Sequence, residues 1–165
     1  MKKVFFLVAG GGFQWESLTL ASQLRDVWSC TYIVPESSVY EGSALVQSIQ
    51  GTPYLVIPEV SSRADNRVWS IARNLWRGIR LLWRQFKQEK PEAAVCVGSS
   101  MSIPIAFICR LRGVPLIFIE SITRTDALSS TGKLLLHSGM VDHFYVQWPE
   151  QEKLHPRARY KGTVL

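Results

Sequence analysis

The sequence predicts an α/β fold built on a doubly wound, mostly parallel sheet. Short apolar runs alternate along the chain with longer segments of helical spacing, which is the pattern of parallel strands joined by helical crossovers. Small-residue turns, at Gly10–Gly12 and Gly98–Ser100, directly follow two of these runs. The length of 165 residues and the apolar fraction of 47% suit one domain with a sizeable core. We therefore expect residues 1–165 to form a single domain.

The N-terminal part of the chain supplies three of the expected strands. They are the apolar runs Val4–Ala9, Thr31–Val34 and Tyr54–Ile57. Every residue of the first run is apolar, which is typical of a parallel strand that is buried on both faces. Apolar spacing predicts a helix over Gln14–Val27 and a shorter one over Ser43–Gln50, and the polar stretch Pro58–Asn66 predicts a loop.

The glycine-rich turn Gly10–Gly12 lies between the first expected strand and the first expected helix. Such a turn can hold an anion, because glycines let backbone N–H groups approach it and the helix N-terminus adds positive potential. The turn is not a full G-x-G-x-x-G pattern, since no further glycine or small residue follows at the required place. Taken alone, the pattern is equally compatible with a tight strand-to-helix turn.

The stretch from 93 to 119 reads as one complete strand–helix–strand unit. The strands are Ala93–Val97 and Leu116–Ile119, and helical spacing joins them over Ile103–Leu111. Arg112–Pro115 closes the helix, with glycine as C-cap and proline just beyond it. We expect a right-handed crossover, as nearly all such units have.

In open parallel sheets, ligands bind beyond the carboxyl ends of the strands. We therefore place the functional site at the turn Gly98–Ser100 and at the loop Glu120–Arg124. Glu120 ends an apolar strand, and a buried carboxylate is costly unless it is paired or functional. Two interpretations stay open for it: a loop-stabilising pair with Arg124, or a carboxylate that takes part in the chemistry.

The segment Arg67–Gln88 is the most unusual helix candidate. Trp69, Trp76 and Trp83 recur every seven residues. Further apolar residues extend this stripe, at Ala72, Ile79 and Phe86, or widen it, at Leu75 and Leu82. Cationic side chains form a ridge beside the tryptophans: Arg73, Arg77, Arg80, Arg84 and Lys87. Contact with an anionic membrane surface is the favoured interpretation. A helix packed on the sheet with a solvated basic face is the alternative, and nothing else in the sequence supports nucleic-acid binding.

Composition and motifs exclude several function classes. The net charge of +6 is modest, and three cysteines in apolar surroundings predict buried free thiols rather than a disulfide framework. The three histidines lack the spacing of metal ligands, so we expect no metal site. Walker A, G-x-S-x-G and C-x-x-C patterns are absent, and no apolar run is long enough for a membrane span. We expect a soluble or peripheral cytoplasmic protein without a cofactor.

The C-terminal part of the chain predicts a helix over Lys133–Ser138 and a strand over His143–Gln147. Tyr160–Leu165 looks like the start of a strand with nothing after it. The chain stops where a larger protein would enter its next domain, so we expect a partner. We interpret residues 147–165 as a C-terminal tail that contacts that partner.

Four stretches of the chain resemble the Alg14 family. They are IFIESITR (Ile117–Arg124), LSSTGKLLLH (Leu128–His137), DHFYVQWPE (Asp142–Glu150) and the final YKGTVL. Together, their E-S-I-x-R, S-x-x-G-K and Q-W-P elements form a specific pattern. The family is named for the acceptor-side subunit of a split transferase in lipid-linked oligosaccharide synthesis, and it also covers bacterial capsule and exopolysaccharide proteins.

The resemblance implies a Rossmann-like domain equivalent to the N-terminal, acceptor-binding half of a GT-B glycosyltransferase of the MurG kind. It implies a two-chain enzyme that transfers a sugar from a UDP-sugar to a polyprenyl-diphosphate-linked sugar. A partner chain of the Alg13 kind would bind the UDP-sugar, and this chain alone would be inactive. We expect peripheral attachment to the cytoplasmic face of a membrane, the bacterial inner membrane rather than the endoplasmic reticulum.

The resemblance also assigns roles to residues. The lipid diphosphate would be held by Gly10, Gly11, Gly12, Gly98, Ser99, Ser100 and Arg124, and Glu120 would be the catalytic residue. Relatives usually carry a histidine where Phe13 stands here, whereas Glu16 fits the acidic or carboxamide position that follows. The eukaryotic N-terminal membrane helix has no counterpart, so the tryptophan and arginine helix would provide attachment.

Two other functions stay open. One is a non-catalytic membrane scaffold that recruits and activates a separate catalytic chain. The other is a self-contained nucleotide-binding module, which is disfavoured because no acidic ribose-binding residue follows the second strand cleanly.

Overall fold

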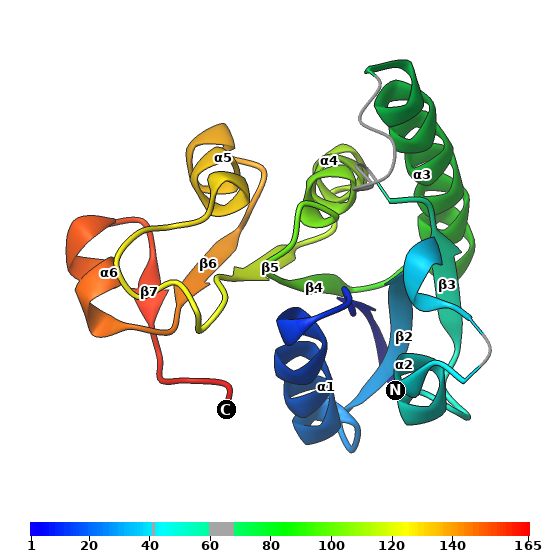
Figure 1. Cartoon of the computed structure of the whole chain (residues 1–165), viewed down its shortest axis with the longest axis horizontal. Helices are drawn as coiled ribbons and strands as arrows, with labels where there is room; N and C mark the ends of the chain where they lie inside the picture. The colour runs from blue at the N-terminus through cyan, green and yellow to red at the C-terminus, as the bar shows by residue number, and fades with distance from the viewer. Residues whose placement is uncertain (41, 60–67) are drawn as a thin grey trace.

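The computed structural model describes residues 1–40, 42–59 and 68–165. Its centre is a seven-stranded sheet in which every pair of neighbours is parallel, in the order β3-β2-β1-β4-β5-β6-β7 (Figure 1). The strands are β1 (Lys2–Leu7), β2 (Trp28–Pro35), β3 (Tyr54–Ile57), β4 (Ala93–Val97), β5 (Leu116–Ile119), β6 (His143–Val146) and β7 (Arg159–Tyr160). The predicted doubly wound α/β class is confirmed.

Helices cover both faces of the sheet. They are α1 (Gly12–Leu24), α2 (Ala44–Ser48), α3 (Val68–Glu89), α4 (Ser102–Arg112), α5 (Ser130–Ser138) and α6 (Pro149–Leu154), with a single 3-10 turn at Glu36–Ser38. Helices α3, α4 and α5 lie on one face, and α1 and α2 lie on the other (Figure 1). The chain winds outward from β1 to β3, returns to β4 beside β1, and then winds outward to β7. The strand order therefore reverses between β1 and β4.

The core has two layers because neighbouring residues of a strand point to opposite faces. On β1, Phe5 and Leu7 pack under α3 and α4, whereas Val4, Phe6 and Val8 pack toward α1 and α2. The ring of Phe5 makes an edge-on contact with Phe86 of α3, with centroids 4.8 Å apart. The buried strand interiors that the apolar runs predict are therefore present.

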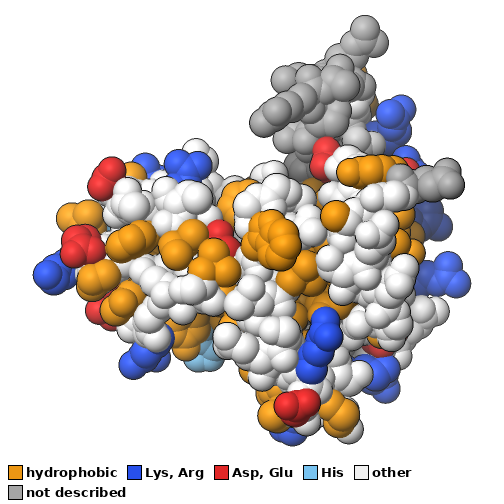
Figure 2. All heavy atoms as spheres, turned by 60° about the horizontal axis from the view of Figure 1, so that its bottom comes forward, with side chains coloured by type: hydrophobic (Ala, Val, Ile, Leu, Met, Phe, Trp, Pro, Cys, Tyr) orange, Lys and Arg blue, Asp and Glu red, His pale blue; other side chains and the backbone are white. Residues whose placement is uncertain are grey.

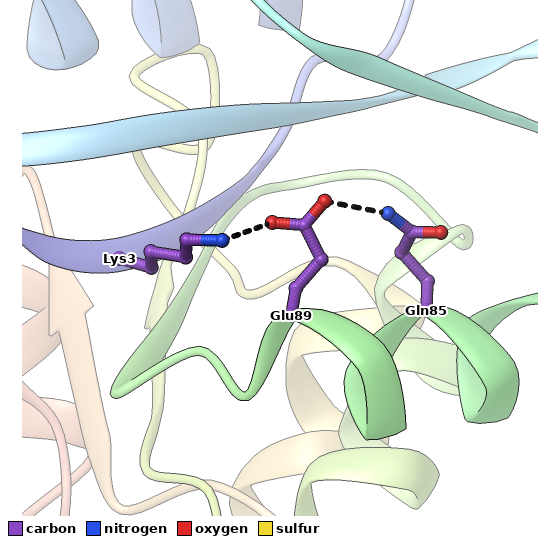
Figure 3. A network of polar contacts seen from close by, with 3 residues as sticks. All are labelled: Lys3, Gln85 and Glu89. Carbon is purple, nitrogen blue, oxygen red and sulfur yellow. Dashed lines mark hydrogen bonds and ion pairs between the residues drawn. The ribbon is translucent and has the colours of Figure 1, made fainter.

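The end of α3 is fixed against β1 by polar contacts. Lys3 Nζ lies 2.9 Å from Glu89 Oε2, and Gln85 Nε2 donates to Glu89 Oε1 at 2.9 Å (Figure 3). An exposed pair of this kind contributes less than about 1 kcal/mol. Its effect is to orient the helix rather than to stabilise the fold.

Several boundaries differ from those expected. Residues 60–66 of the loop predicted over Pro58–Asn66, and Arg67, lie outside the described residues. Helix α6 was not predicted, although Pro149 at its first turn is a known start signal. The expected strand Tyr160–Leu165 is wrong, because only Arg159–Tyr160 pairs with β6 and the chain then turns away at Gly162, where φ is 106°. Part of the expected tail thus supplies a helix and the seventh strand.

Candidate functional site

Two loops meet where the strand order reverses. Phe13 lies in the first turn of α1, just after the turn that follows β1, and its ring packs directly on Gly98 in the turn after β4. A Cβ at Gly98 would lie 2.3 Å from Phe13 Cε1, and φ at Gly98 is +54°. Ser99 has a left-handed φ of 62° as well. Only glycine fits at position 98. The two successive positive φ values give the turn a left-handed backbone conformation, which is strained at Ser99.

The larger of two neighbouring hollows at this edge has a volume of about 320 Å³. Its lining comes from the first turn of α1, the turn after β4, the loop after β5 and the start of α5: Phe13, Ser99, Ser100, Glu120, Arg124, Ser129, Ser130 and Thr131. The predicted residues Ser99, Ser100, Glu120 and Arg124 are therefore brought together. Hydroxyl groups, one carboxylate and one guanidinium share this space.

The second hollow has a volume of about 200 Å³ and lies toward β2. It shares Phe13, Ser99 and Ser100 with the first, so the Phe13 ring separates the two spaces. Gly10 lines it, opposite a carboxylate and hydroxyls that were not predicted: Ser37, Ser38 and Glu59. Gly11 and Gly12 line neither hollow and lie exposed at the start of α1.

Backbone N–H groups at this edge are free to bind an anion. In the described parts of the chain, the N–H groups of Ser99 and Ser100 have no acceptor, whereas that of Gly98 is bound to Ile119 O at 2.8 Å. The N-termini of α4 and α5 start beside the larger hollow and add positive potential. With exposed Arg124, the larger hollow has the chemistry of a phosphate site.

Glu120 is 1% exposed, and its carboxylate is held by backbone and hydroxyl donors. Oε2 accepts from Ser129 N at 3.0 Å and from Ser129 Oγ at 2.9 Å, and Oε1 accepts from Ser121 N at 3.2 Å. The expected pair with Arg124 is wrong, because no ion pair joins these two described residues and Arg124 is exposed. Burial at the strand end brings the carboxylate to the start of α5 instead.

The S-x-x-G-K element has a glycine at position 132, three residues after Ser129, because a larger residue would not fit there. A Cβ at Gly132 would lie 2.0 Å from Glu120 Oε2. Ser129 caps α5 by accepting from Gly132 N at 2.9 Å while its hydroxyl donates to Glu120. The E-S-I-x-R and S-x-x-G-K elements therefore form one contact.

A second buried acid, Glu16 of α1, holds the loop after β5. It is 1% exposed; Oε1 accepts from Ser121 Oγ at 2.7 Å and Oε2 accepts from Ile122 N at 3.0 Å. Gln147 Nε2 also donates to Glu16 Oε2, and to Glu120 O at 3.0 Å. The sequence singles out Glu16 as an acidic position, but its partners are more than a hundred residues away and nothing local could identify them.

The same loop is held from α6. Trp148 Nε1 donates to Ile122 O at 2.7 Å, and Gln151 Nε2 donates to Thr125 O at 2.7 Å. Both backbone groups of Ile122 are thus bound by side chains. We call the residues that hold the loop 120–129 the loop clamp: Glu16, Gln147, Trp148 and Gln151. The Q-W-P element therefore has a structural role, because the Gln147 and Trp148 side chains hold the loop.

Helix α3 presents its tryptophans outward. Trp69 is 88% exposed, Trp76 66% and Trp83 41%. Four arginines beside them are exposed too: Arg73, Arg77, Arg80 and Arg84. We call these seven residues the α3 face. The expectation that Ile79 and Phe86 extend the tryptophan stripe is wrong, because both pack toward the core with Leu82 on another side of the helix.

Helix α4 adds to this surface in a way that the sequence analysis missed. Phe107 and Leu111 are exposed one turn apart, and Arg112 lies over the Trp83 ring with 4.6 Å between its Cζ and the ring centroid. In the described parts of the chain, no helix has both the length and the apolar character required to cross a bilayer. The α3 face thus combines exposed aromatic and cationic side chains.

Fold and site together define a Rossmann-like α/β domain with a polar site at the point where the strand order reverses. The crystal structure of MurG from Acinetobacter baumannii superposes with a TM-score of 0.73 at 20% identity, over 90% of this chain and 42% of MurG. This chain therefore has the fold of one half of a GT-B glycosyltransferase.

The family comparison is more specific. A model described as "Oligosaccharide biosynthesis protein Alg14 like" matches residues 6–164, and the chain belongs to this family. Among curated relatives, the UDP-N-acetylglucosamine transferase subunit ALG14 of Homo sapiens is 30% identical over 65% of this chain and 50% of the human protein. The alg14 subunit of Schizosaccharomyces pombe is 29% identical over 98% of this chain and 81% of its own length. The match thus spans half of the human protein and less than half of MurG.

Proposed function

We propose that this protein is the membrane-associated, acceptor-binding subunit of a two-component glycosyltransferase. The reaction would move a sugar from a UDP-sugar to a polyprenyl-diphosphate-linked sugar. Because the relatives are named UDP-N-acetylglucosamine transferase subunits, UDP-N-acetylglucosamine is the donor we propose. The observation that carries the proposal is the larger hollow, where free backbone N–H groups, Arg124 and Glu120 share one open space at the carboxyl edge of the sheet.

The diphosphate would bind at the turn after β4. Ser99 N–H and Ser100 N–H are available, and the Arg124 guanidinium can neutralise charge and donate two hydrogen bonds at once. Gly10 lines the smaller hollow, and Gly11 and Gly12 lie exposed at the start of α1, so these three glycines would contact the diphosphate only where it extends beyond the larger hollow. Gly98 would act indirectly, since its missing side chain lets Phe13 close the space between the two turns.

Glu120 would orient or deprotonate the acceptor hydroxyl. Its Oε1 accepts a single hydrogen bond, from Ser121 N, and a carboxylate oxygen has room for a second. Oε2 is occupied by the two Ser129 donors, which would fix the carboxylate during the reaction. General-base assistance of this kind contributes about 10²- to 10⁴-fold to rate.

Attachment to the membrane would use the α3 face. Exposed tryptophans favour the lipid headgroup region, and arginines are attracted to anionic lipids by about 1 kcal/mol each. The partner, of the Alg13 kind, would supply the nucleotide-sugar site and contact residues 147–165. This chain would then be inactive alone, at the cytoplasmic face of a bacterial inner membrane.

The direct test is reconstitution. The purified chain is assayed with UDP-N-acetylglucosamine and a polyprenyl-diphosphate-linked sugar in anionic vesicles, with and without a partner chain of the Alg13 kind. We expect transfer only when both chains are present. Robust transfer by this chain alone would refute the two-component proposal, and no transfer by the pair would refute the assigned reaction.

A non-catalytic scaffold is the second candidate, and the three hydrogen bonds that Glu120 already accepts favour it. Glu120→Gln separates the two functions because it keeps the side-chain shape. The catalytic role predicts a fall in kcat of about a hundredfold or more, whereas the scaffold predicts near-normal turnover. Asp126→Asn is the matched control, because Asp126 is an exposed acid in the same loop that does not line the hollow.

A further inference from the structure

The side chain of Gln147 joins two parts of the molecule by hydrogen bonds. One is the C-terminal segment, whose Val164 N donates to Gln147 Oε1 at 2.8 Å. The other is the acceptor-site loop, because Gln147 Nε2 donates to Glu120 O at 3.0 Å and to the Glu16 carboxylate. Gln147 is buried, so water does not compete for these bonds.

The carboxamide is planar, so its oxygen and nitrogen move as one rigid unit. Both N–H groups of Nε2 have an acceptor on the loop side, and the oxygen has its donor on the C-terminal side. A shift of Val164 therefore either breaks a bond at Oε1 or rotates the donors away from Glu16 and Glu120. No flexible linker lies between the two ends.

Glu16 extends the connection to the residues that line the hollow. Its carboxylate holds Ser121 Oγ and Ile122 N, which lie directly between Glu120 and Arg124. Ser121 N in turn donates to Glu120 Oε1, the oxygen that we propose faces the acceptor. Moving Gln147 thus changes the support of both functional side chains of the loop.

The C-terminal segment is accessible to another molecule. Residues 161–164 line a hollow of about 280 Å³ together with Leu20 and Gln23 of α1. Leu165 is exposed, and hydrophobic side chains gather on the part of the surface in Figure 2 that holds α5, α6 and this segment. In Figure 1 the C-terminal end of the chain lies at the margin of the molecule, away from α5 and α6. Contact with the segment can therefore displace Val164.

We propose that Gln147 is a positioning residue that couples the C-terminal segment 163–165 to the acceptor-site loop 120–124. The acceptor part of this inference rests on the proposed function. Docking of the proposed nucleotide-sugar-binding partner on the segment adjusts the geometry of the loop through the Gln147 carboxamide, so that the site is completed when the segment is seated.

Val164→Pro tests the coupling because proline removes the one N–H that Gln147 accepts, with little change in side-chain volume. Leu165→Pro is the matched control, since Leu165 N has no acceptor among the described residues. The readout is amide hydrogen exchange, measured by NMR, at the N–H of Ile122. The reference is the N–H of Tyr32 in β2, which donates to Pro53 O. Loss of one hydrogen bond corresponds to about tenfold in exchange.

We expect Val164→Pro to raise exchange at Ile122 about tenfold and to leave Tyr32 unchanged, with Leu165→Pro changing neither. Gln147→Met, which keeps length without hydrogen bonding, should act as Val164→Pro does. Unchanged exchange at Ile122, or an equal rise at Tyr32, would overturn the coupling.

The same variants are then assayed with the partner. We expect a KM for the lipid acceptor that rises about tenfold in Val164→Pro, with a smaller change in the KM for the UDP-sugar. An unchanged acceptor KM would overturn the functional part of the coupling. If the wild-type pair transfers no sugar, the proposed function fails, and the exchange result still decides whether Gln147 couples the two segments.

Discussion

The loop clamp and the α3 face use side chains in opposite ways. The clamp and the loop that it holds contain two buried acids, Glu16 and Glu120, each of which accepts from several hydrogen-bond donors. The α3 face instead exposes three tryptophans, which are large apolar side chains that folding normally buries. Residue type alone is therefore a poor guide to burial in this molecule. Two acids lie inside it with several hydrogen-bond donors each, whereas aromatic side chains of a kind that folding normally buries face outward.

Glu16→Ala gives the largest effect that this comparison predicts. It removes the carboxylate that accepts from Ile122 N, from Ser121 Oγ and from one of the two N–H groups of Gln147 Nε2. Unsatisfied buried donors cost roughly 1–3 kcal/mol each, so we expect a loss of about 3 kcal/mol in the free energy of unfolding, measured in urea. Asp26→Ala, at an exposed acid, should change it by less than about 0.5 kcal/mol. Equal effects of the two substitutions would remove the distinction between clamp and surface.

A glycine-to-alanine substitution in each region tests the difference between the held loop and α3. Gly132→Ala places a methyl group against Glu120 Oε2, and the carboxylate can only move by giving up its Ser129 donors. We expect a loss of about 2 kcal/mol in the free energy of unfolding. Gly78→Ala lies within α3, where a Cβ meets nothing within 4 Å. It should stabilise the protein by about 0.5–1 kcal/mol because alanine favours helix. A stabilising Gly132→Ala would show that the clamp is loose.

Most of the fold could be predicted from the sequence, because apolar runs and small-residue turns are local signals. The strands at Tyr54–Ile57, Ala93–Val97 and Leu116–Ile119 were predicted with their observed bounds. The clamp could not be predicted, since its hydrogen bonds join residues far apart in the chain. The pair of Glu120 with Arg124, one of the two interpretations that the sequence left open, is wrong for the same reason: Ser129 is the partner because the start of α5 brings it close.

For α3, the heptad spacing predicted the tryptophan column, and the favoured interpretation, contact with a membrane surface, required the exposed tryptophans that the structure has. The spacing alone did not decide between this interpretation and a packed helix. A column of one residue type every seven positions fits a buried or an exposed side equally well. Leu82 and Phe86 form the buried side instead, and only the packing of α3 against the sheet decides between the two. The roles of the site residues and of the α3 face stay predictions.

The α3 face is tested by Trp76→Ala combined with Arg77→Ala. Both side chains are exposed, so stability should change by less than about 0.5 kcal/mol. Co-sedimentation with vesicles that contain anionic lipid should weaken roughly tenfold, since one arginine contributes about 1 kcal/mol and the tryptophan adds to it. Trp15→Ala with Arg25→Ala removes an exposed tryptophan and arginine from the opposite face of the sheet as a matched control. If both double variants bind equally, α3 is an ordinary packing helix.

The smallest predicted effect concerns the buried thiols in the core between β4 and α4. They extend the comparison to buried groups that have no charged partner. Burial raises the pKa of the Cys96 thiol from its ordinary 9.0 to about 12, against a smaller opposing effect of the Ser102 hydroxyl, and burial raises the pKa of Cys109 as well. The folded state therefore favours the protonated thiol. The resulting stability is present below pH 9 and is lost as the pH rises from 9 toward 12, because the unfolded chain ionises first.

One thiol should contribute a decrease of roughly 1 kcal/mol in unfolding free energy between about pH 8 and pH 9.5. Cys96→Ala removes this contribution and keeps that of Cys109, so the curve for the variant should fall less steeply than that of the wild type in urea titrations. Parallel curves would mean that water reaches Cys96. Water would then reach the buried side of α4 as well as its exposed side. The contrast between a water-free core and the exposed α3 face would not extend to α4.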